Sequence, residues 1–133
     1  MGGPTHVVRI PAHVVDDALQ TVPNVVRRQG RDGSVIEVEG NNHYHGTSSR
    51  MTRILDCGAT GLRNSTKADC ANFARIADAL PRIAFASPAV HASDVPQSVA
   101  ALHGYEASLT NTSKHCLATP QNLQEAQAWT DLA

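Results

Sequence analysis

The chain has few aromatic side chains: two Phe, two Tyr and one Trp make up only 4% of its 133 residues. A hydrophobic core must therefore be built mainly from Ala, Val, Leu and Ile. Apolar residues still account for 41% of the sequence, an ordinary value for a globular protein, so wholesale disorder is not expected. The length predicts one domain with a modest single core.

Neither sign of charge dominates the sequence. Eleven Lys and Arg against twelve Asp and Glu give a formal net charge of −1, and the two signs are interspersed. Without a basic stripe, the chain has no electrostatic footprint for nucleic acid or for an anionic membrane. Its apolar runs are too short to span a membrane, and the start lacks the basic and then apolar regions of a secretory signal. We therefore predict no nucleic-acid partner and no membrane association.

Cysteine is scarce, and the three that occur, Cys57, Cys70 and Cys116, are odd in number and widely spaced. They form neither a disulfide framework nor a CxxC redox or zinc signature. We interpret them as small buried hydrophobes of a reduced, cytoplasmic protein. The motifs GxGxxG, GxxxxGKS/T and GxSxG are absent too, so neither a phosphate-binding loop nor a hydrolase nucleophile elbow is supported.

The first half of the chain predicts little regular structure. Pro11 can open a helix that ends near Thr21, because four apolar residues follow it at helical spacing (Val14, Val15, Ala18 and Leu19). A turn at 29–33 then leads into a short strand at 35–39. Residues 40–66 are rich in Gly, Asn, Ser, Thr and Arg and are predicted to be loop, with at most a short strand at Thr52–Leu55.

The second half alternates between helical and strand patterns. Thr66 and Asp69 form a capping box for a helix that Pro81 ends. Its apolar face is predicted to consist of Cys70, Phe73, Ala74, Ala77 and Leu80. The pattern continues with a strand at 83–86, a helix at 97–110, a strand at 115–118 and a last helix that begins at Asn122.

This rhythm, with roughly 30 residues per unit, is typical of βαβ packing and a parallel sheet. The run Ile83–Ala86 is wholly apolar, which favours a strand covered on both faces. A closed (β/α)₈ barrel needs about 250 residues, so the chain predicts only the opening of one. We expect an N-terminal helix, short strand and loop region over 1–66, and the first βα units of an incomplete TIM barrel over 67–133.

Several segments together resemble the trimethylamine methyltransferase family. None of them is a catalytic motif, so the resemblance depends on their order and spacing over nearly the whole chain. The segments are Val8–Pro11 with Val14–Leu19, Tyr44–Thr47, Leu55–Asp56, Ala77–Ile83 with Phe85–Pro88, Ser93–Pro96, and Asn111–His115.

The resemblance implies a fold and a reaction. Members of this family are (β/α)₈ barrels several times longer than this chain. They move a methyl group from a methylated amine, trimethylamine or a quaternary amine such as glycine betaine, to a cobalt(I) corrinoid on a separate protein, and some of them use pyrrolysine. The chain is therefore expected to bind no cofactor directly, to have a corrinoid protein and a methylated amine as partners, and to be inactive alone. Its open strand edges also predict either self-association or a missing barrel segment.

Barrel enzymes place their functional groups at the C-terminal ends of the strands. Ser87 and Thr119 follow the two predicted strands, and we predict that both line the amine pocket. That they simply end the strands is an equally open interpretation. Asp94 is suited to attract a cation, but we favour a turn that leads into a helix.

Two further hypotheses use other parts of the sequence. His43 and His45 would share one face of a strand and suggest a small zinc-binding protein. No third ligand has a telling spacing, so no metal site is predicted. The other hypothesis is a non-catalytic remnant that serves as an interaction module.

Overall fold

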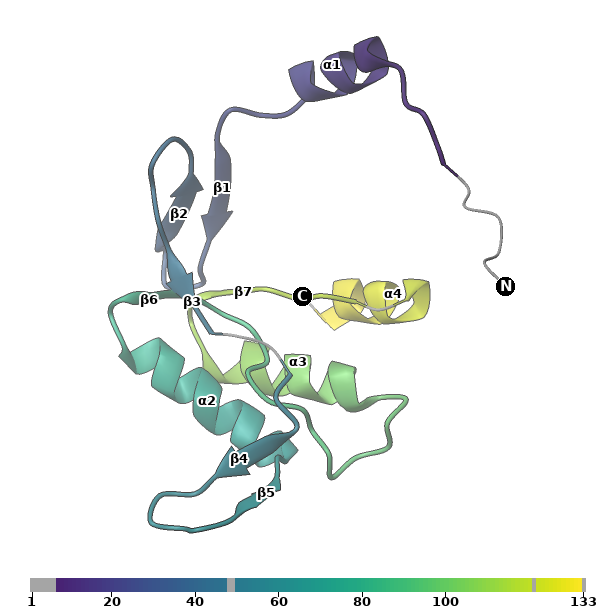
Figure 1. Ribbon diagram of the computed structural model, residues 1–133. Coiled ribbons are helices and arrows are strands. Elements are labelled where there is room, and N and C mark those ends of the chain that lie inside the picture. Colours follow the sequence, from purple (N-terminus) through teal and green to yellow (C-terminus); the bar gives the residue numbers. More distant parts are fainter. Residues whose placement is uncertain (1–6, 48–49, 121, 133) are drawn as a thin grey trace.

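A computed structural model describes residues 7–47, 50–120 and 122–132 (Figure 1). The described chain is a mixed α/β structure whose centre is a three-stranded parallel sheet. None of its helices is long and apolar enough to cross a membrane. The sheet has the order β3-β6-β7, which is also the order of the strands in the sequence.

The parallel sheet consists of β3 (His45–Gly46), β6 (Ile83–Ala86) and β7 (His115–Cys116). Phe85 lies opposite His115 and Ala86 opposite Cys116. The prediction that the two C-terminal strands are parallel neighbours is therefore confirmed, although β7 is shorter than predicted.

The prediction that residues 40–66 form a loop is wrong at β3, which pairs in parallel with β6. Two residues are too short to show any alternation of apolar and polar side chains, so no sequence pattern marks this strand. Gly46 is required by the close approach of the two strands. A Cβ built there would lie 2.0 Å from the Phe85 ring.

Two antiparallel hairpins flank the sheet. The first pairs β1 (Val26–Gln29) with β2 (Val35–Val38), and the second pairs β4 (Arg53–Leu55) with β5 (Leu62–Asn64). β2 and β4 agree with the predicted strands. β1 and β5 were not predicted, because both are dominated by polar residues without a period of two.

The turn of the first hairpin is fastened to the segment before β7. The backbone N–H of Asp32 donates to the carbonyl of Ser113 at 3.0 Å. The guanidinium of Arg31 donates to the carbonyls of Leu109 and Thr112, at the C-terminal end of a helix. This end of a helix carries partial negative charge, so Arg31 stabilises it while it holds the hairpin in place.

Helix α2 (Lys67–Ala79) begins at the predicted capping box. Asp69 N–H donates to Thr66 Oγ1 at 3.3 Å, and Thr66 N–H donates to Asp69 Oδ2 at 2.8 Å. Its buried face holds Cys70, Ala74 and Ala77, as predicted. The prediction that Phe73 and Leu80 also belong to this buried face is wrong, because both side chains are exposed.

Small side chains let α2 pack closely against α3 (Ala100–Asn111). Cys70 is fully buried between them, and its thiol donates to the carbonyl of Val90 at 3.2 Å. Burial raises the pKa of this thiol to about 11, so it is protonated at neutral pH. The prediction of a buried structural cysteine is thus confirmed for Cys70 and wrong for Cys57, which is exposed. Cys116 is intermediate.

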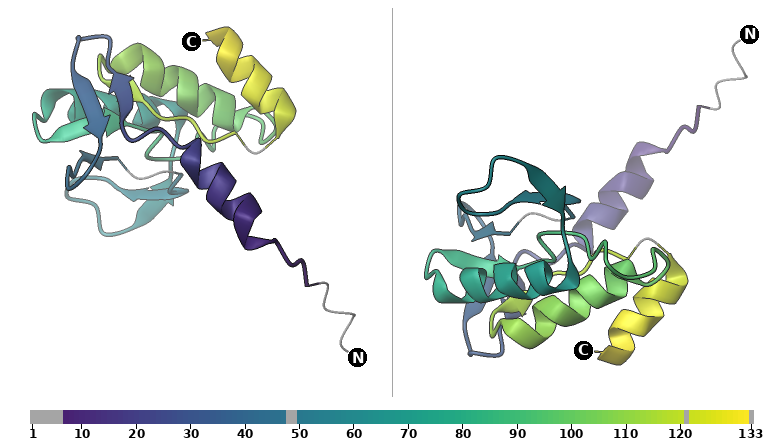
Figure 2. Two further views of the ribbon diagram at one scale, coloured as in Figure 1. Left: turned by 90° about the horizontal axis from the view of Figure 1, so that it is seen from above. Right: turned by 90° about the horizontal axis from the view of Figure 1, so that it is seen from below.

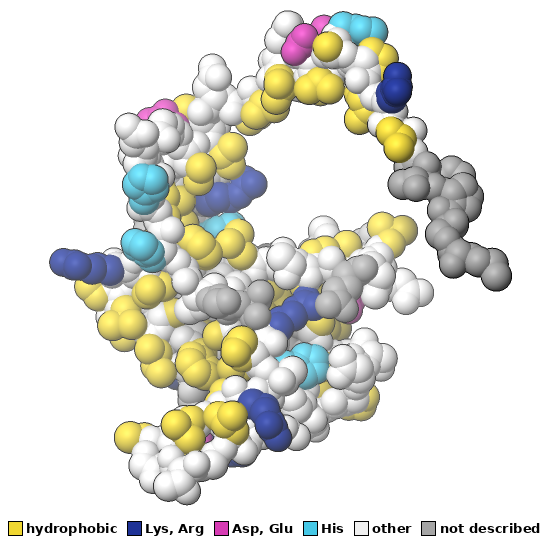
Figure 3. All heavy atoms as spheres, viewed as in Figure 1, with side chains coloured by type: hydrophobic (Ala, Val, Ile, Leu, Met, Phe, Trp, Pro, Cys, Tyr) yellow, Lys and Arg dark blue, Asp and Glu magenta, His cyan; other side chains and the backbone are white. Residues whose placement is uncertain are grey.

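The two remaining helices are α1 (Ala12–Gln20) and α4 (Leu123–Leu132). Trp129 of α4 stacks on Tyr105 of α3, with ring centroids 5.0 Å apart. α1 has the predicted bounds but no buried residue. It projects from the rest of the molecule in each view of Figures 1 and 2. Figure 3 shows hydrophobic side chains gathered on the side of α1 that is turned toward the rest of the molecule.

The C-terminal end of α2 is tied to the start of β7. Asp78 Oδ1 accepts hydrogen bonds from the backbone N–H of Ser113 at 2.6 Å and from Thr112 Oγ1 at 2.9 Å. Lys114 Nζ donates to two carbonyls at the end of the helix, Ala77 and Leu80. These contacts lie at the N-terminal end of the strand, where they fix its register.

The N-terminal end of α2 depends on a buried carboxylate. Asp69 is 7% exposed, and it forms two hydrogen bonds with the guanidinium of Arg63, of 2.7 and 2.9 Å. Arg63 also binds the exposed carboxylate of Asp56, at 2.6 and 2.8 Å. The Arg63 hydrogen bonds, followed by those from Thr66, hold the pKa of Asp69 well below its usual range.

Replacing Asp69→Asn is expected to lower the free energy of unfolding by about 2 kcal/mol, because both the helix cap and the ion pair with Arg63 are weakened. The folded-state pKa lies below the unfolded value of about 3.9, so the stabilisation is complete at neutral pH and is lost as the pH falls below about 4. Urea unfolding between pH 7 and pH 3 measures both effects.

Asp56→Asn is the matched control, since it removes an exposed partner of the same arginine. Its unfolding midpoint at neutral pH is expected to stay close to that of the parent chain. Equal losses for the two variants would contradict the special role of Asp69.

Candidate functional site

The C-terminal ends of β3 and β6 are joined by the residues that follow them, Thr47 and Ser87. Ser87 N–H donates to Thr47 Oγ1 at 2.7 Å, and Thr47 Oγ1 donates to the Ser87 carbonyl at 2.8 Å. The hydroxyl of Ser87 donates to the carbonyl of Thr47 at 2.8 Å. Ser87 therefore lies at the predicted end of the strand, where it fastens two neighbouring strands together.

Thr119 lies beyond the C-terminal end of β7 and is exposed. Its carbonyl accepts a hydrogen bond of 2.7 Å from the guanidinium of Arg50. The backbone N–H of Arg50 in turn donates to the carbonyl of Pro88 at 3.0 Å. Arg50 thus connects the segment after β6 to the segment after β7, and it brings Ser87 and Thr119 to the same edge of the sheet.

Arg50 has an unusual backbone, with a φ of 67° in the left-handed region. Backbone hydrogen bonds of a parallel bridge between the segments at Met51 and Val90 hold Arg50 in this conformation. Met51 N–H donates to Ala89 O at 3.1 Å, and His91 N–H donates to Met51 O at 2.9 Å. A non-glycine residue in this conformation is strained, and such residues often occur at functional sites.

A cavity of about 320 Å³ opens beside Arg50. Its lining comes from the segments that follow β3 and β6 and from the N-terminal parts of α3 and α4. The lining residues are Arg50, Thr52, His91, Ser93, Gln97, Ala101 and Glu125. Within this lining, His91 Nε2 lies 3.1 Å from Gln97 Oε1. The cavity therefore presents a guanidinium, an imidazole, an amide, hydroxyls and a carboxylate to a small ligand.

This cavity contains residues that sequence patterns did not single out. Arg50 and Gln97 are two of them, whereas Glu125 had a predicted role only in starting the last helix. These three residues come from separate segments, and only the fold brings them together. His91 lies on the segment between β6 and α3. Neither Ser87 nor Thr119 lines this cavity, so their predicted role in binding the amine stays a prediction.

Asp94 has a structural role in the described chain. Its Oδ1 accepts a hydrogen bond of 2.7 Å from the backbone N–H of Lys67, the first residue of α2. Asp94 lies in a turn, as the favoured interpretation expected. Asp94 caps α2 rather than α3, because the loop after β6 folds back across the start of α2.

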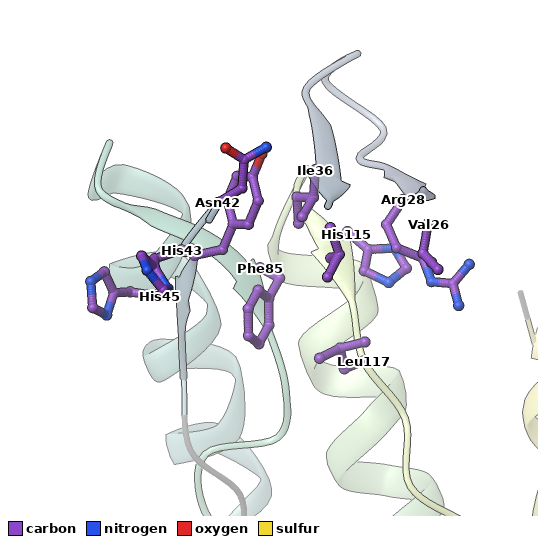
Figure 4. A pocket seen from close by; sticks show the side chains of 11 residues that line it. Val26, Arg28, Ile36, Asn42, His43, His45, Phe85, His115 and Leu117 are labelled. Carbon is purple, nitrogen blue, oxygen red and sulfur yellow. The ribbon is translucent and has the colours of Figure 1, made fainter. Parts of the chain in front are cut away.

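A larger groove of about 850 Å³ lies between the β1–β2 hairpin and one face of the parallel sheet (Figure 4). We call it the hairpin groove. Its lining is mostly apolar, with one arginine and three histidines. The lining residues are Val26, Arg28, Ile36, Val38, Asn42, His43, Tyr44, His45, Phe85, His115 and Leu117.

The hypothesis of a zinc site at His43 and His45 gains no support from the described residues. Both histidines line the hairpin groove. Within the described part of the chain, no group of three or more His, Cys, Asp or Glu side chains is placed to hold a metal ion. A structural zinc site normally has four ligands.

The comparison with known proteins decides the family. A model of the family described as "Trimethylamine methyltransferase (MTTB)" matches residues 4–133. The chain belongs to the trimethylamine methyltransferase family. The resemblance found in the sequence is therefore confirmed.

Three curated members of the family illustrate the similarity. Trimethylamine methyltransferase MttB of Desulfitobacterium hafniense is 33% identical over 117 residues, which are 84% of this chain and 23% of that protein. MttB of Methanosarcina thermophila is 34% identical over 84% of this chain and 24% of its own length. MttB1 of Methanosarcina mazei is 33% identical over 84% and 23%. The chain thus spans about a quarter of the length of these trimethylamine methyltransferase family relatives.

The strain at Arg50 gives a direct test of the geometry at this edge. Arg50→Ala and Arg50→Gly both remove the hydrogen bond to Thr119, but only glycine relieves the left-handed backbone. We expect the glycine variant to be more stable than the alanine variant by about 1 kcal/mol, as measured by urea unfolding. An alanine variant as stable as the glycine variant would show that the backbone is not held in this conformation.

Proposed function

We propose that this chain forms part of an enzyme that transfers a methyl group from a methylated amine to a cobalt(I) corrinoid carried by a separate protein. Membership of the trimethylamine methyltransferase family is the observation that carries the proposal. The amine is trimethylamine or a quaternary amine such as glycine betaine.

The parallel sheet supports the proposal that the chain contributes the first strands of a (β/α)₈ barrel. β3, β6 and β7 lie side by side in sequence order, with α2 before β6 and α3 between β6 and β7. A barrel is built by the same repeated step. The division at residue 66 into an N-terminal region and the first βα units is part of this proposal.

The reaction divides into a part for the cofactor and a part for the protein. When a tertiary or quaternary amine gives up a methyl group, the amine that remains is a poor leaving group, and a cobalt(I) corrinoid would supply the strong nucleophile that this demethylation requires. The protein must hold the amine in line and keep water away from it. In a barrel, the groups that do so lie at the C-terminal ends of the strands.

The cavity beside Arg50 suits a small polar molecule and does not suit the corrinoid. Its volume of about 320 Å³ is at the lower end of the range for ligand cavities. A corrin macrocycle is too large for it, and we place no cofactor on this chain. In this proposal, Ser87 and Thr119 at the C-terminal ends of β6 and β7 contribute to the part of the site that binds the amine.

We propose that the isolated chain has no methyltransferase activity, because about three quarters of the length of its relatives is not represented in it. The test compares the 133-residue chain with a full-length family protein that contains it. Each is mixed with cobalt(I) cobalamin and trimethylamine or glycine betaine, and formation of methylcobalamin is followed by absorbance. Product is expected only with the full-length protein, and its absence there with every amine would contradict the proposed function.

In the full-length protein, Thr119→Val and Ser87→Ala are expected to raise the KM for the amine several-fold, because both residues are proposed to line its pocket. Glu39→Gln is the control, since Glu39 is exposed and lies beyond the end of β2. An unchanged KM in both variants, with an unchanged fold by circular dichroism, would assign the two residues to strand termination alone.

A further inference from the structure

The segment after β3 reaches both neighbouring segments through one residue, Arg50. Its backbone N–H donates to the carbonyl of Pro88 at 3.0 Å, two residues beyond the end of β6. Its guanidinium donates to the carbonyl of Thr119 at 2.7 Å, three residues beyond the end of β7. Arg50 is therefore bound at once to the segments that follow β6 and β7.

The backbone of Arg50 shows that this double attachment is made against local strain. Its φ of 67° lies in the left-handed region, which glycine adopts freely and a residue with a Cβ does not. A strained residue persists where the surrounding structure fixes it, and such residues are concentrated at functional sites. Glycine would suit this backbone better than arginine, but it has no side chain that could bind Thr119.

The position of Thr119 depends on the guanidinium of Arg50. The N–H of Leu117 donates to the carbonyl of Ala86 at 2.7 Å, so the segments stay joined up to that point. Thr119 lies two residues further along, is exposed and belongs to no helix or strand. A segment of this kind is mobile unless a contact restrains it. The hydrogen bond from Arg50 supplies such a restraint.

Ser87 is fixed by a separate set of contacts. Its backbone N–H donates to Thr47 Oγ1 at 2.7 Å, and its hydroxyl donates to the carbonyl of Thr47 at 2.8 Å. Thr47 follows β3 directly, and Arg50 lies three residues further along the same segment. The segment after β3 thus holds Ser87 through Thr47 and Thr119 through Arg50, which sets the spacing between the two predicted pocket residues.

We propose that Arg50 is a positioning residue of the amine pocket: its guanidinium holds Thr119 in a fixed place relative to Ser87, and this raises the affinity for the amine. The inference rests on the proposed function, because it takes Ser87 and Thr119 as residues that line the pocket. A pocket that is fixed in advance loses less conformational entropy when its ligand binds. Arg50 acts through Thr119 and makes no contact with the amine itself.

The test measures equilibrium binding of the amine, which needs no corrinoid. The dissociation constants of trimethylamine and glycine betaine are determined by titration calorimetry in the full-length family protein that contains this chain. Arg50→Met keeps the length of the side chain but cannot donate, and it is expected to raise the Kd of the bound amine about fivefold. Arg50→Lys retains a donor and is expected to stay within about twofold of the parent. Arg82→Met is the matched control, because Arg82 is exposed and precedes β6 at the opposite edge of the sheet.

A double variant separates positioning from direct contact. If Arg50 acts through Thr119, Arg50→Met adds nothing once Thr119→Val has removed the hydroxyl that it positions. The double variant is therefore expected to have a Kd within about twofold of that of Thr119→Val alone. If Arg50 touched the amine on its own account, the two increases in Kd would multiply.

Hydrogen exchange of residues 117–119, followed by mass spectrometry, reports on the restraint itself. Exchange is expected to be faster in Arg50→Met than in the parent and to return to the parent rate in Arg50→Lys. Unchanged exchange, an unchanged Kd in Arg50→Met, or increases in Kd that multiply would each overturn the proposal, as would a parent protein that binds neither amine. If the amine binds with the expected pattern but no methylcobalamin forms, the proposed function fails and the positioning role stands.

Discussion

The parallel pairing of β6 with β7 is the constraint on which the rest of the structure depends. Parallel neighbours require a crossover connection, and here the segment 87–114, with α3 at its centre, provides it. The helix must return across the sheet beside α2, and the two helices can approach because the core between them contains the small side chains of Cys70 and Ala107. A core with few aromatic residues is thus compatible with this packing, since small side chains bring the helices together.

The same pairing determines where functional groups can gather. Because the strands run in one direction, their C-terminal ends share an edge, and the segments after β3, β6 and β7 meet there. Hydrogen bonds connect the segments at this edge, between Thr47 and Ser87 and between Arg50 and Thr119. The opposite edge is fixed by Asp78 and Lys114, whose hydrogen bonds join the end of α2 to the start of β7. One edge therefore provides stability, and the other carries the cavity.

Sequence patterns predicted the elements whose signals are local. The Thr66–Asp69 box and the apolar run at 83–86 are formed by neighbouring residues, and both appear in the structure as predicted. β3 and β1 were missed because a short strand with polar residues is stabilised by pairing with a neighbouring strand, and the local sequence does not show that pairing. The polar cavity was missed for a related reason. Arg50, Gln97 and Glu125 are far apart in the sequence, and no spacing between them indicates that they meet.

The parallel pairing of β6 with β7 in one sheet is tested most directly by nuclear Overhauser effects between the backbone protons of the two strands in the isotopically labelled chain. Parallel strands are expected to give contacts that advance in the same direction along both strands, from Phe85 with His115 to Ala86 with Cys116 and Leu117. Contacts that run in opposite directions, or no contacts between the two strands, would contradict it.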